Sequence, residues 1–289
     1  MGTSITGMIG LFDSGHGGLT IFRTLVRRFP GQQFVYLGDH ANAPYGNRPA
    51  DEIVALTRAG VETLYGEGCR LVVLACNTAS VIACRTLQQN WLPGASYEGH
   101  NILGVVAPMV EAATQTPWAV TSPQYPQKYY TETVAIFSTS RTVSSGVYTE
   151  EIGKRCPKVR VFEQPCADLA GAIEQGRAKS GLDRLVARYA GELMARTKGT
   201  PPERAILGCT HFPLVEELFV RHLPPSTRLL SQPQVVADSL EDYLTRHPHY
   251  GKAREGHPAP RLLTTGKPES VAQSLEAFWS EPQAFEAAG

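Results

Sequence analysis

Two stretches of this sequence share one pattern, in which a short aliphatic run is followed by a cysteine and then by polar residues that include a threonine. Residues 71–80 read LVVLACNTAS, and residues 205–214 read AILGCTHFPL. Uninterrupted aliphatic runs of this length are typical of strands that are buried on both faces of a parallel sheet. A helical pattern follows each run, so Cys76 and Cys209 are predicted to lie where a strand ends and a helix begins. Ligands of open α/β sheets bind at such strand ends.

Strand and helix patterns alternate along the whole chain, which predicts an α/β fold. Two series of these patterns occur in 289 residues, a length that allows two domains with cores of their own. We therefore expect two α/β domains with parallel sheets. Because the polar turns follow strands in both series, we expect the active site in the cleft between the domains.

The charge balance excludes some classes of function. The chain has 27 basic and 27 acidic residues, which argues against a role on nucleic acid or on a membrane surface that is driven by charge. No apolar run approaches the roughly 20 residues of a membrane-spanning helix. The N-terminal residues contain no basic region and no cleavage signal, so we expect a cytoplasmic protein. None of the six cysteines stands in a CxxC pair, which disfavours a zinc site, and we expect no metal.

Strands are also predicted at residues 8–12 and 33–37, and a polar loop follows each of them. The first loop begins with Asp13 and Ser14 and is rich in glycine, but it lacks the third glycine of a dinucleotide-binding fingerprint. These two residues either approach a small polar ligand or cap the next helix. The second loop contains Tyr45, which either donates a hydroxyl hydrogen bond to a ligand or packs over the core.

Two thiols that face one substrate suit proton transfer on opposite faces of a single carbon, which is stereoinversion without a cofactor. A thiolate is favoured at a helix N-terminus, and a sulfur base can work near neutral pH. We expect Asp13 to pair with Cys76, and Glu174 or His211 to pair with Cys209. A cysteine protease would leave one of the two thiols without a role. A single cysteine is more often an inert buried thiol, the interpretation that fits Cys69 and Cys84; these two are not counted among the site residues.

Five motifs in this order make the sequence similar to the glutamate racemase family, within the aspartate/glutamate racemase superfamily. They are IGLFDSGHGGLT (9–20), YLGDHANAPYGNR (36–48), LACNTAS (74–80), STSRTVSSGVY (138–148) and LGCTHFPL (207–214). The resemblance implies two α/β domains with the active site between them. It also implies cofactor-independent interconversion of L- and D-glutamate, which supplies D-glutamate for peptidoglycan.

The resemblance assigns roles to individual residues. It makes Cys76 and Cys209 the two proton donors and acceptors, and the assisting residues are Asp13, His211 and Glu174. Substrate binding falls to residues of the same motifs: Ser14, Pro44, Tyr45, Gly46, Asn77, Thr78, Thr139, Thr142 and Thr210. The first domain would comprise residues 1–108 plus 231–289, and the second would comprise residues 109–230. Glutamate would be the small-molecule partner, and we expect a homodimer because the family often forms one.

Several positions depart from the family pattern. His16 stands in place of a small aliphatic residue, where we expect it to fill space, and Arg141 replaces a glycine and would bring a cation near the substrate. The segment around Glu174 lacks the usual prolines, and residues 114–133 resemble an insertion. Two alternatives remain open: an aspartate racemase or other isomerase of the superfamily, and a non-catalytic amino-acid-binding protein.

Overall fold

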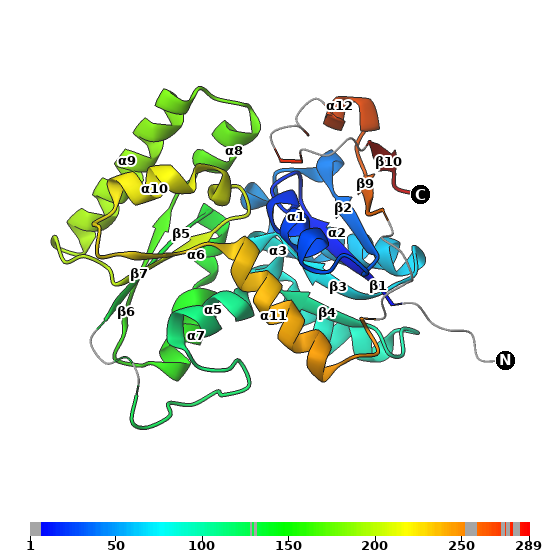
Figure 1. The fold of residues 1–289 in the computed structure, drawn as a ribbon, viewed down its shortest axis with the longest axis horizontal. Coiled ribbons are helices and arrows are strands. Elements are labelled where there is room, and N and C mark those ends of the chain that lie inside the picture. The colour runs from blue at the N-terminus through cyan, green and yellow to red at the C-terminus, as the bar shows by residue number, and fades with distance from the viewer. Residues whose placement is uncertain are drawn as a thin grey trace. The chain divides into compact units, whose positions relative to one another are not determined.

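The computed structural model describes residues 7–127, 129, 132–251, 259–272, 275, 278–279 and 284–289. The chain divides into two compact units, Met1–Val105 with Val236–Gly289 (unit 1) and Val106–Val235 (unit 2). Each unit contains one parallel sheet with helices packed against it (Figure 1), so the predicted α/β class with parallel sheets is confirmed. The domain boundaries expected at residues 108 and 230 stay a prediction.

The sheet of unit 1 has the strand order β10-β9-β2-β1-β3-β4, and every pair of neighbours is parallel. Its strands are β1 (Met8–Asp13), β2 (Phe34–Gly38), β3 (Cys69–Leu74), β4 (Asn101–Gly104), β9 (Arg261–Thr264) and β10 (Phe285–Ala287). The main helices of this part of the chain are α1 (Leu19–Arg28), α2 (Ala50–Gly66), α3 (Asn77–Ile82) and α4 (Cys84–Thr86), followed near the C-terminus by α11 (Gln232–Arg246) and α12 (Pro268–Ala272).

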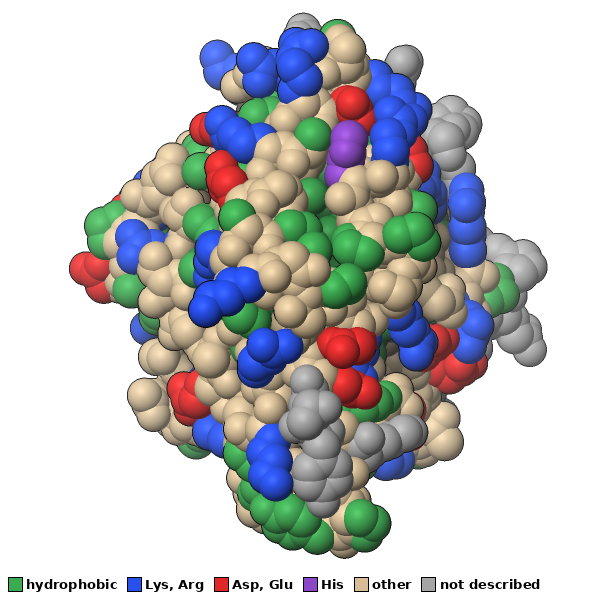
Figure 2. Space-filling view, turned by 90° about the vertical axis from the view of Figure 1, so that its left-hand side faces the viewer, with side chains coloured by type: hydrophobic (Ala, Val, Ile, Leu, Met, Phe, Trp, Pro, Cys, Tyr) green, Lys and Arg blue, Asp and Glu red, His purple; other side chains and the backbone are tan. Residues whose placement is uncertain are grey.

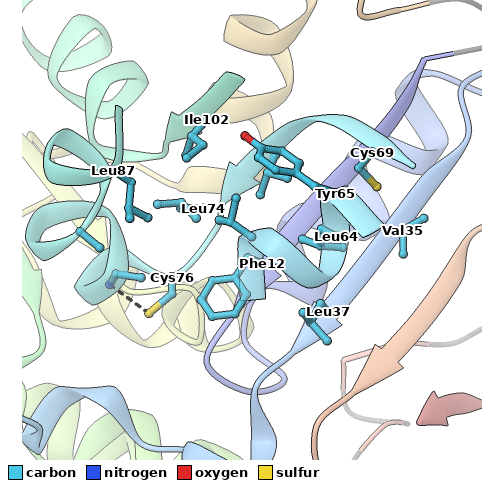
Figure 3. Close-up of a cluster of buried hydrophobic side chains, with 14 of the residues drawn as sticks. Phe12, Val35, Leu37, Leu64, Tyr65, Cys69, Leu74, Cys76, Leu87 and Ile102 are labelled. Atoms are coloured by element: carbon cyan, nitrogen blue, oxygen red, sulfur yellow. Dashed lines mark hydrogen bonds between the residues drawn. The ribbon is translucent and has the colours of Figure 1, made fainter. Parts of the chain in front are cut away.

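Strand β2 shows how the sheet of unit 1 is covered on both faces. The rings of Phe34 and Tyr36 contact Phe22 of α1, with centroids 6.2 and 5.3 Å apart. Val35 and Leu37 instead join the buried cluster that contains side chains of α2 (Figure 3). Because successive side chains of a strand point to opposite faces, α1 and α2 cover opposite faces of the sheet. This double cover explains why the strand is buried throughout.

The sheet of unit 2 has the order β6-β5-β7-β8 and is also parallel throughout. Its strands are β5 (Thr133–Ser138), β6 (Arg160–Pro165), β7 (Arg204–Gly208) and β8 (Arg228–Leu230). Its helices are α5 (Val106–Thr114), α6 (Ser140–Ser145), α7 (Val147–Arg155), α8 (Leu169–Glu174), α9 (Lys179–Arg196) and α10 (Glu216–His222). Helix α5 packs on α7, and α9 packs on α10 (Figure 1).

The strand order determines which loops meet. Strands β2, β1 and β3 are neighbours in unit 1, and β6, β5 and β7 are neighbours in unit 2. Since all of them are parallel, the residues that follow these strands gather at one edge of each sheet. Both predicted cysteines follow one of these strands, so each unit brings a cysteine to the edge where ligands of α/β sheets bind.

Helix α5 was not expected from the sequence, which predicts that the chain crosses from the first domain to the second after residue 108. The helix begins at Val106, so Pro108 lies in its first turn. A proline is tolerated there because the first backbone N–H groups of a helix have no partner within the helix.

The sequence pattern predicts a helix that begins at Val143 and continues to Cys156, but the structure has two helices here, α6 and α7. Gly146 has a φ of 64°, in the left-handed region, and its N–H bonds to Val143 O at the end of α6. Helix α7 then starts at Val147. A glycine in this conformation is a common helix stop, and it separates the part of the segment that carries Thr139 and Thr142 from the rest.

The segment between α5 and β5, which resembles an insertion, contains turns but no helix or strand in its described residues. The buried side chain of Arg155 donates to the carbonyl oxygen of Trp118 and lies 4.5 Å from the centre of its ring. Near the C-terminus, the polar sequence of residues 247–260 predicts a loop, of which residues 252–258 lie outside the described residues. The sequence pattern also predicts a helix over residues 268–279, which is described as α12 only as far as Ala272.

No helix among the described residues combines the length and the apolar character that crossing a membrane requires. Figure 2 shows basic and acidic side chains interspersed over one face of the molecule. That face shows no large field of a single sign, which agrees with the balanced charge of the sequence.

Candidate active site

Cys76 lies between the end of β3 and the start of α3. It is the N-cap residue of α3, and its sulfur accepts a hydrogen bond from the backbone N–H of Ala79 at 3.5 Å (Figure 3). The sequence pattern predicts a helix from Ala79, but the helix begins two residues earlier, at Asn77, because the cysteine itself provides the cap. The predicted placement of this thiol at a helix N-terminus is confirmed, and only 6% of its surface is exposed.

Asp13 is the last residue of β1, and Ser14 follows it next to Cys76. The carboxylate of Asp13 accepts a hydrogen bond from the N–H of Gly15 at 2.9 Å and so shapes its own turn. The hydroxyl of Ser14 lies 3.5 Å from the sulfur of Cys76. A side chain at Gly18 would place its Cβ 2.7 Å from Cβ of Asp13, so the close approach of this turn requires a glycine. The direct pairing of Asp13 with Cys76 stays a prediction.

Tyr45 is buried, and its hydroxyl donates a 2.6 Å hydrogen bond to the carboxylate of Asp39. Burial and this hydrogen bond raise the pKa of Tyr45 well above its usual value. The one hydroxyl proton is used inside the protein, so the hydroxyl is not available as the ligand donor that the sequence suggested. Tyr45 can still offer its ring, its backbone and the lone pairs of its oxygen.

The other candidate residues of unit 1 lie in the same two loops. Asn77 and Thr78 are buried in the first turn of α3, directly after Cys76. Pro44 follows a cis peptide bond, and Gly46 lies in the short 3₁₀ helix η2 (Tyr45–Asn47). We call the group of candidates in this unit the Cys76 cluster; it consists of Asp13, Ser14, Pro44, Tyr45, Gly46, Cys76, Asn77 and Thr78.

Cys209 follows β7, but the predicted helix after it does not begin there. A turn leads into the short 3₁₀ helix η5 (Phe212–Val215), and α10 starts only at Glu216. Pro213 explains the delay, because a proline disfavours the α conformation for the residue before it. The expectation that Cys209 lies at the start of an α-helix was therefore wrong, and this thiol lacks the cap geometry of Cys76.

The partner of Cys209 is an imidazole. Its sulfur lies 3.8 Å from Nδ1 of His211, and Nε2 of His211 lies 3.4 Å from a carboxylate oxygen of Glu174 at the end of α8. Burial alone would lower the pKa of His211, but the hydrogen bonds and charges of Cys209 and Glu174 outweigh it and raise that pKa well above its ordinary value. Contacts therefore run from the Glu174 carboxylate through the His211 imidazole to the Cys209 sulfur. The sequence predicts that Glu174 or His211 pairs with Cys209; in the structure the imidazole is the group next to the sulfur, and the assisting roles of both residues stay a prediction.

Thr139 caps α6, accepting a hydrogen bond from the N–H of Thr142 at 3.3 Å, and the two hydroxyls are 3.1 Å apart. Thr210 is buried between Cys209 and His211 in the chain. We call the candidates of unit 2 the Cys209 cluster; it consists of Thr139, Thr142, Glu174, Cys209, Thr210 and His211. Within the described residues, Nε of Arg141 is buried without a hydrogen-bond partner, and the prediction that Arg141 brings a cation to the substrate remains untested.

His16, where a space-filling role is expected, is buried in unit 1. Its Nε2 donates a 3.0 Å hydrogen bond to the carbonyl oxygen of Val271, and its ring stacks on Phe278 with centroids 5.4 Å apart. The centre of its ring also lies 4.3 Å from the centre of the His40 ring. The side chain therefore both fills space and connects the Asp13 loop to the C-terminal segment.

Three buried residues beside the clusters were not selected from the sequence. Asp39 follows β2 as Asp13 ends β1, and Cys166 follows β6 as Cys209 follows β7, so position after a strand was a usable signal for both. Burial, and then the charge of Cys209, raise the pKa of Cys166. Burial, and then the charges of Glu163 and Cys209, raise the pKa of Tyr148, for which the sequence held no such signal.

Comparison with known proteins shows the family of the chain. A glutamate racemase from Phenylobacterium zucineum is 48% identical to this chain over 284 residues, which are 97% of this chain and 99% of the relative. A glutamate racemase from a Caulobacter species shows the same identity and the same coverage. The chain belongs to the glutamate racemase family. The resemblance seen in the sequence motifs is thereby confirmed, and as a member of this family the chain is an isomerase.

A solved structure has the same fold. The glutamate racemase from Francisella tularensis, in complex with D-glutamate, matches with a TM-score of 0.80 and 25% identity, covering 99% of this chain and 98% of that chain. No protein-family model matches the sequence. Membership of the family therefore rests on the curated relatives and the fold.

Proposed function

We propose that this protein interconverts L- and D-glutamate without a cofactor, and that Cys76 and Cys209 are the two acid–base groups. The observation that carries the proposal is the chemistry around the two sulfurs. Each thiol follows a strand of its own sheet, and each contacts a group that can form hydrogen bonds to sulfur, the hydroxyl of Ser14 or the imidazole of His211. Relatives that are named glutamate racemase over nearly the whole chain support the choice of substrate.

The reaction begins with one cysteine as thiolate and the other as thiol. The thiolate removes the α-proton, so that the C–H bond breaks, an S–H bond forms, and the electron pair stays on the substrate as a planar carbanion. The opposite thiol then gives its proton to the other face of the same carbon and becomes the thiolate. The configuration is inverted and no atom is gained or lost. The cysteines exchange roles in the reverse direction.

The substrate's charged groups need polar partners, and the two clusters supply them. We propose that Asn77 and Thr78, whose backbone N–H groups open helix α3, bind a carboxylate of glutamate. The hydroxyls of Ser14, Thr139, Thr142 and Thr210 would complete the binding, with Pro44, Tyr45 and Gly46 shaping the pocket. Binding of this kind holds the α-carbon in line with the reacting sulfurs.

The assisting residues differ in what they can do. His211 contacts the sulfur of Cys209 and can receive or return its proton, while Glu174 holds the imidazole in place through the other ring nitrogen. We propose that Asp13 assists Cys76 by shaping the loop that carries the Ser14 hydroxyl.

D-Glutamate produced in this way would serve peptidoglycan synthesis, and we propose a cytoplasmic homodimer as its working form. The motifs of the sequence that resemble the glutamate racemase family support these roles. Gel filtration with light scattering checks the dimer, for which a mass near twice the 31.4 kDa of the chain is expected.

The function is tested by incubating purified protein with enantiopure L-glutamate, D-glutamate or L-aspartate, with no cofactor added, and separating the enantiomers by chiral chromatography. We expect each glutamate enantiomer to approach a racemic mixture. Racemisation of aspartate alone would keep the mechanism and replace the substrate. Binding of glutamate without turnover of any acid would favour the amino-acid-binding protein and contradict the proposal.

A further inference from the structure

Asp39 is a buried carboxylate that no step of the proposed reaction uses. It directly follows β2 and is 3% exposed. Its two oxygens accept hydrogen bonds from Nδ2 of Asn42 at 2.9 and 3.2 Å, from the hydroxyl of Tyr45 at 2.6 Å and from the hydroxyl of Thr265 at 2.6 Å. A buried charge of this kind is retained only where its partners are satisfied, so the carboxylate is an organising centre for three separate side chains.

The direction of these hydrogen bonds follows from chemistry. An ionised carboxylate only accepts, so the hydroxyls of Tyr45 and Thr265 must both donate to Asp39. The oxygen of Thr265 in turn accepts from the N–H of Ala41 at 3.2 Å. Each group of the network can therefore adopt only one arrangement, and the ring of Tyr45 is held at its hydroxyl end.

A second strand end supports the same loop. The N–H of Thr265 bonds to the carbonyl oxygen of Gly38 at 3.2 Å, and the hydroxyl of Thr264 lies 2.9 Å from Nδ1 of His40. Thr264 and Thr265, at the end of β9, therefore hold the loop after β2 by hydrogen bonds on both sides of Asp39. Since β9 is the neighbour of β2 in the sheet, this support belongs to the rigid part of unit 1.

We propose that Asp39 is a positioning residue for substrate binding, and that it acts through the hydroxyl of Tyr45. The carboxylate holds the turn Tyr45–Asn47, with Pro44 before it, in the conformation that receives the substrate, and Thr265 holds the carboxylate. This inference rests on the proposed function, in which the turn contacts glutamate.

The test compares Asp39→Asn, Tyr45→Phe and the double variant, with Asp51→Asn as the control because Asp51 is an exposed aspartate of the same unit. Tyr45→Phe removes the hydrogen bond between Tyr45 and Asp39, and Asp39→Asn replaces one of the two acceptor oxygens by an amide donor, so the side chain can no longer accept from both Tyr45 and Thr265. We expect KM for both glutamate enantiomers to rise roughly tenfold in each, and to rise no further in the double variant. The kcat should change less than KM, because binding is lost and not chemistry. The control should keep the wild-type KM.

KM distinguishes positioning from a merely structural role. Partial unfolding lowers the concentration of active enzyme and therefore the apparent kcat, but it leaves KM unchanged. An unchanged KM in Asp39→Asn would overturn the inference. It would also be overturned if KM of the double variant rose by the product of the increases in the two single variants. If Asp39→Asn does not fold, Thr265→Val takes its place; it removes one donor to the carboxylate and should raise KM severalfold, and its double variant with Tyr45→Phe should have a KM no higher than that of Tyr45→Phe alone. A wild-type protein that does not turn over glutamate at all would contradict the proposed function instead.

Discussion

The sulfur of Cys76 accepts a hydrogen bond from a helix amide and contacts the hydroxyl of Ser14. The sulfur of Cys209 instead contacts the imidazole of His211, whose other ring nitrogen contacts a carboxylate. Their sequence motifs nevertheless look alike. The difference arises after the cysteine: α3 starts at once beyond Cys76, while Pro213 delays α10 and leaves a turn that carries His211.

A helix amide and an imidazole stabilise a sulfur in different ways. The amide is a fixed donor that favours negative charge on sulfur at any pH, because it cannot lose its proton. The imidazole can exchange a proton with the sulfur, and its influence depends on pH. The two thiols of the proposed reaction would therefore be tuned by a fixed group in unit 1 and by a titrating group in unit 2.

The largest effect is expected from removing either sulfur. Cys76→Ala and Cys209→Ala should each lower the rate of glutamate racemisation by roughly 1,000-fold or more, since each variant lacks one of two acid–base groups. Racemisation is followed by chiral chromatography, and circular dichroism confirms the fold. Normal turnover in either variant would show that the two clusters do not share one reaction.

Removal of the imidazole should have the next largest effect. His211→Asn leaves the sulfur of Cys209 without a titrating contact, and kcat should fall roughly 100-fold. The matched control is His222→Asn, because His222 of the same unit pairs with Asp183 at 2.9 Å on α9, away from the cluster. Equal losses in both variants would point to a general loss of stability and not to a role beside Cys209.

Glu174→Gln should have a smaller effect on rate, roughly two- to fivefold, because the side chain is 31% exposed and its ion pair is partly screened. Its clearer effect is on stability against pH. The pKa of His211 is raised on folding, so the stabilisation by its charge is complete below about pH 6.5 and is lost as pH rises through the raised pKa.

In Glu174→Gln that pKa is raised less, so the decline of unfolding free energy with pH should be smaller and should end at a lower pH than in the wild-type protein. Urea unfolding at a series of pH values from 6 to 9.5 measures this difference. Superimposable curves of unfolding free energy against pH would mean that Glu174 does not set the charge of His211.

The smallest effect is expected on the Cys76 side. Ser14→Ala removes a neutral hydroxyl 3.5 Å from the sulfur but leaves the amide of Ala79 in place, so kcat/KM should fall roughly twofold. Ser96→Ala, at an exposed position of the same unit, is the control. A loss as large as that in His211→Asn would show that the serine, and not the helix amide, governs Cys76.

The sequence was sufficient for the parallel strands and for the cysteines that follow them. The apolar run at β5 predicted that strand with its observed bounds, because burial on both faces leaves an almost unbroken apolar pattern. The length of α2 was also correct. Candidate residues that directly follow strands, such as Asp13 and Cys76, could be found because a parallel sheet brings these positions to one edge.

Features that depend on a single local geometry could not be predicted. Strand β10 has three residues and pairs only with β9 among the described strands, so it leaves no periodic pattern. The network around Asp39 joins residues more than 200 positions apart, and no spacing in the sequence reveals that Thr265 reaches it. The contrast between the two sulfurs was missed for the same reason, since it depends on where each helix begins.

The central claim is that two thiols act on opposite faces of one carbon. Its most direct test is to incubate L-glutamate with the protein in D₂O and to analyse both enantiomers by proton NMR at low conversion. The account predicts D-glutamate with deuterium at the α-carbon and recovered L-glutamate that keeps its proton, because the acid that completes inversion carries a solvent deuteron. D-Glutamate that retains the original α-proton would show one base acting on both faces and would contradict the account.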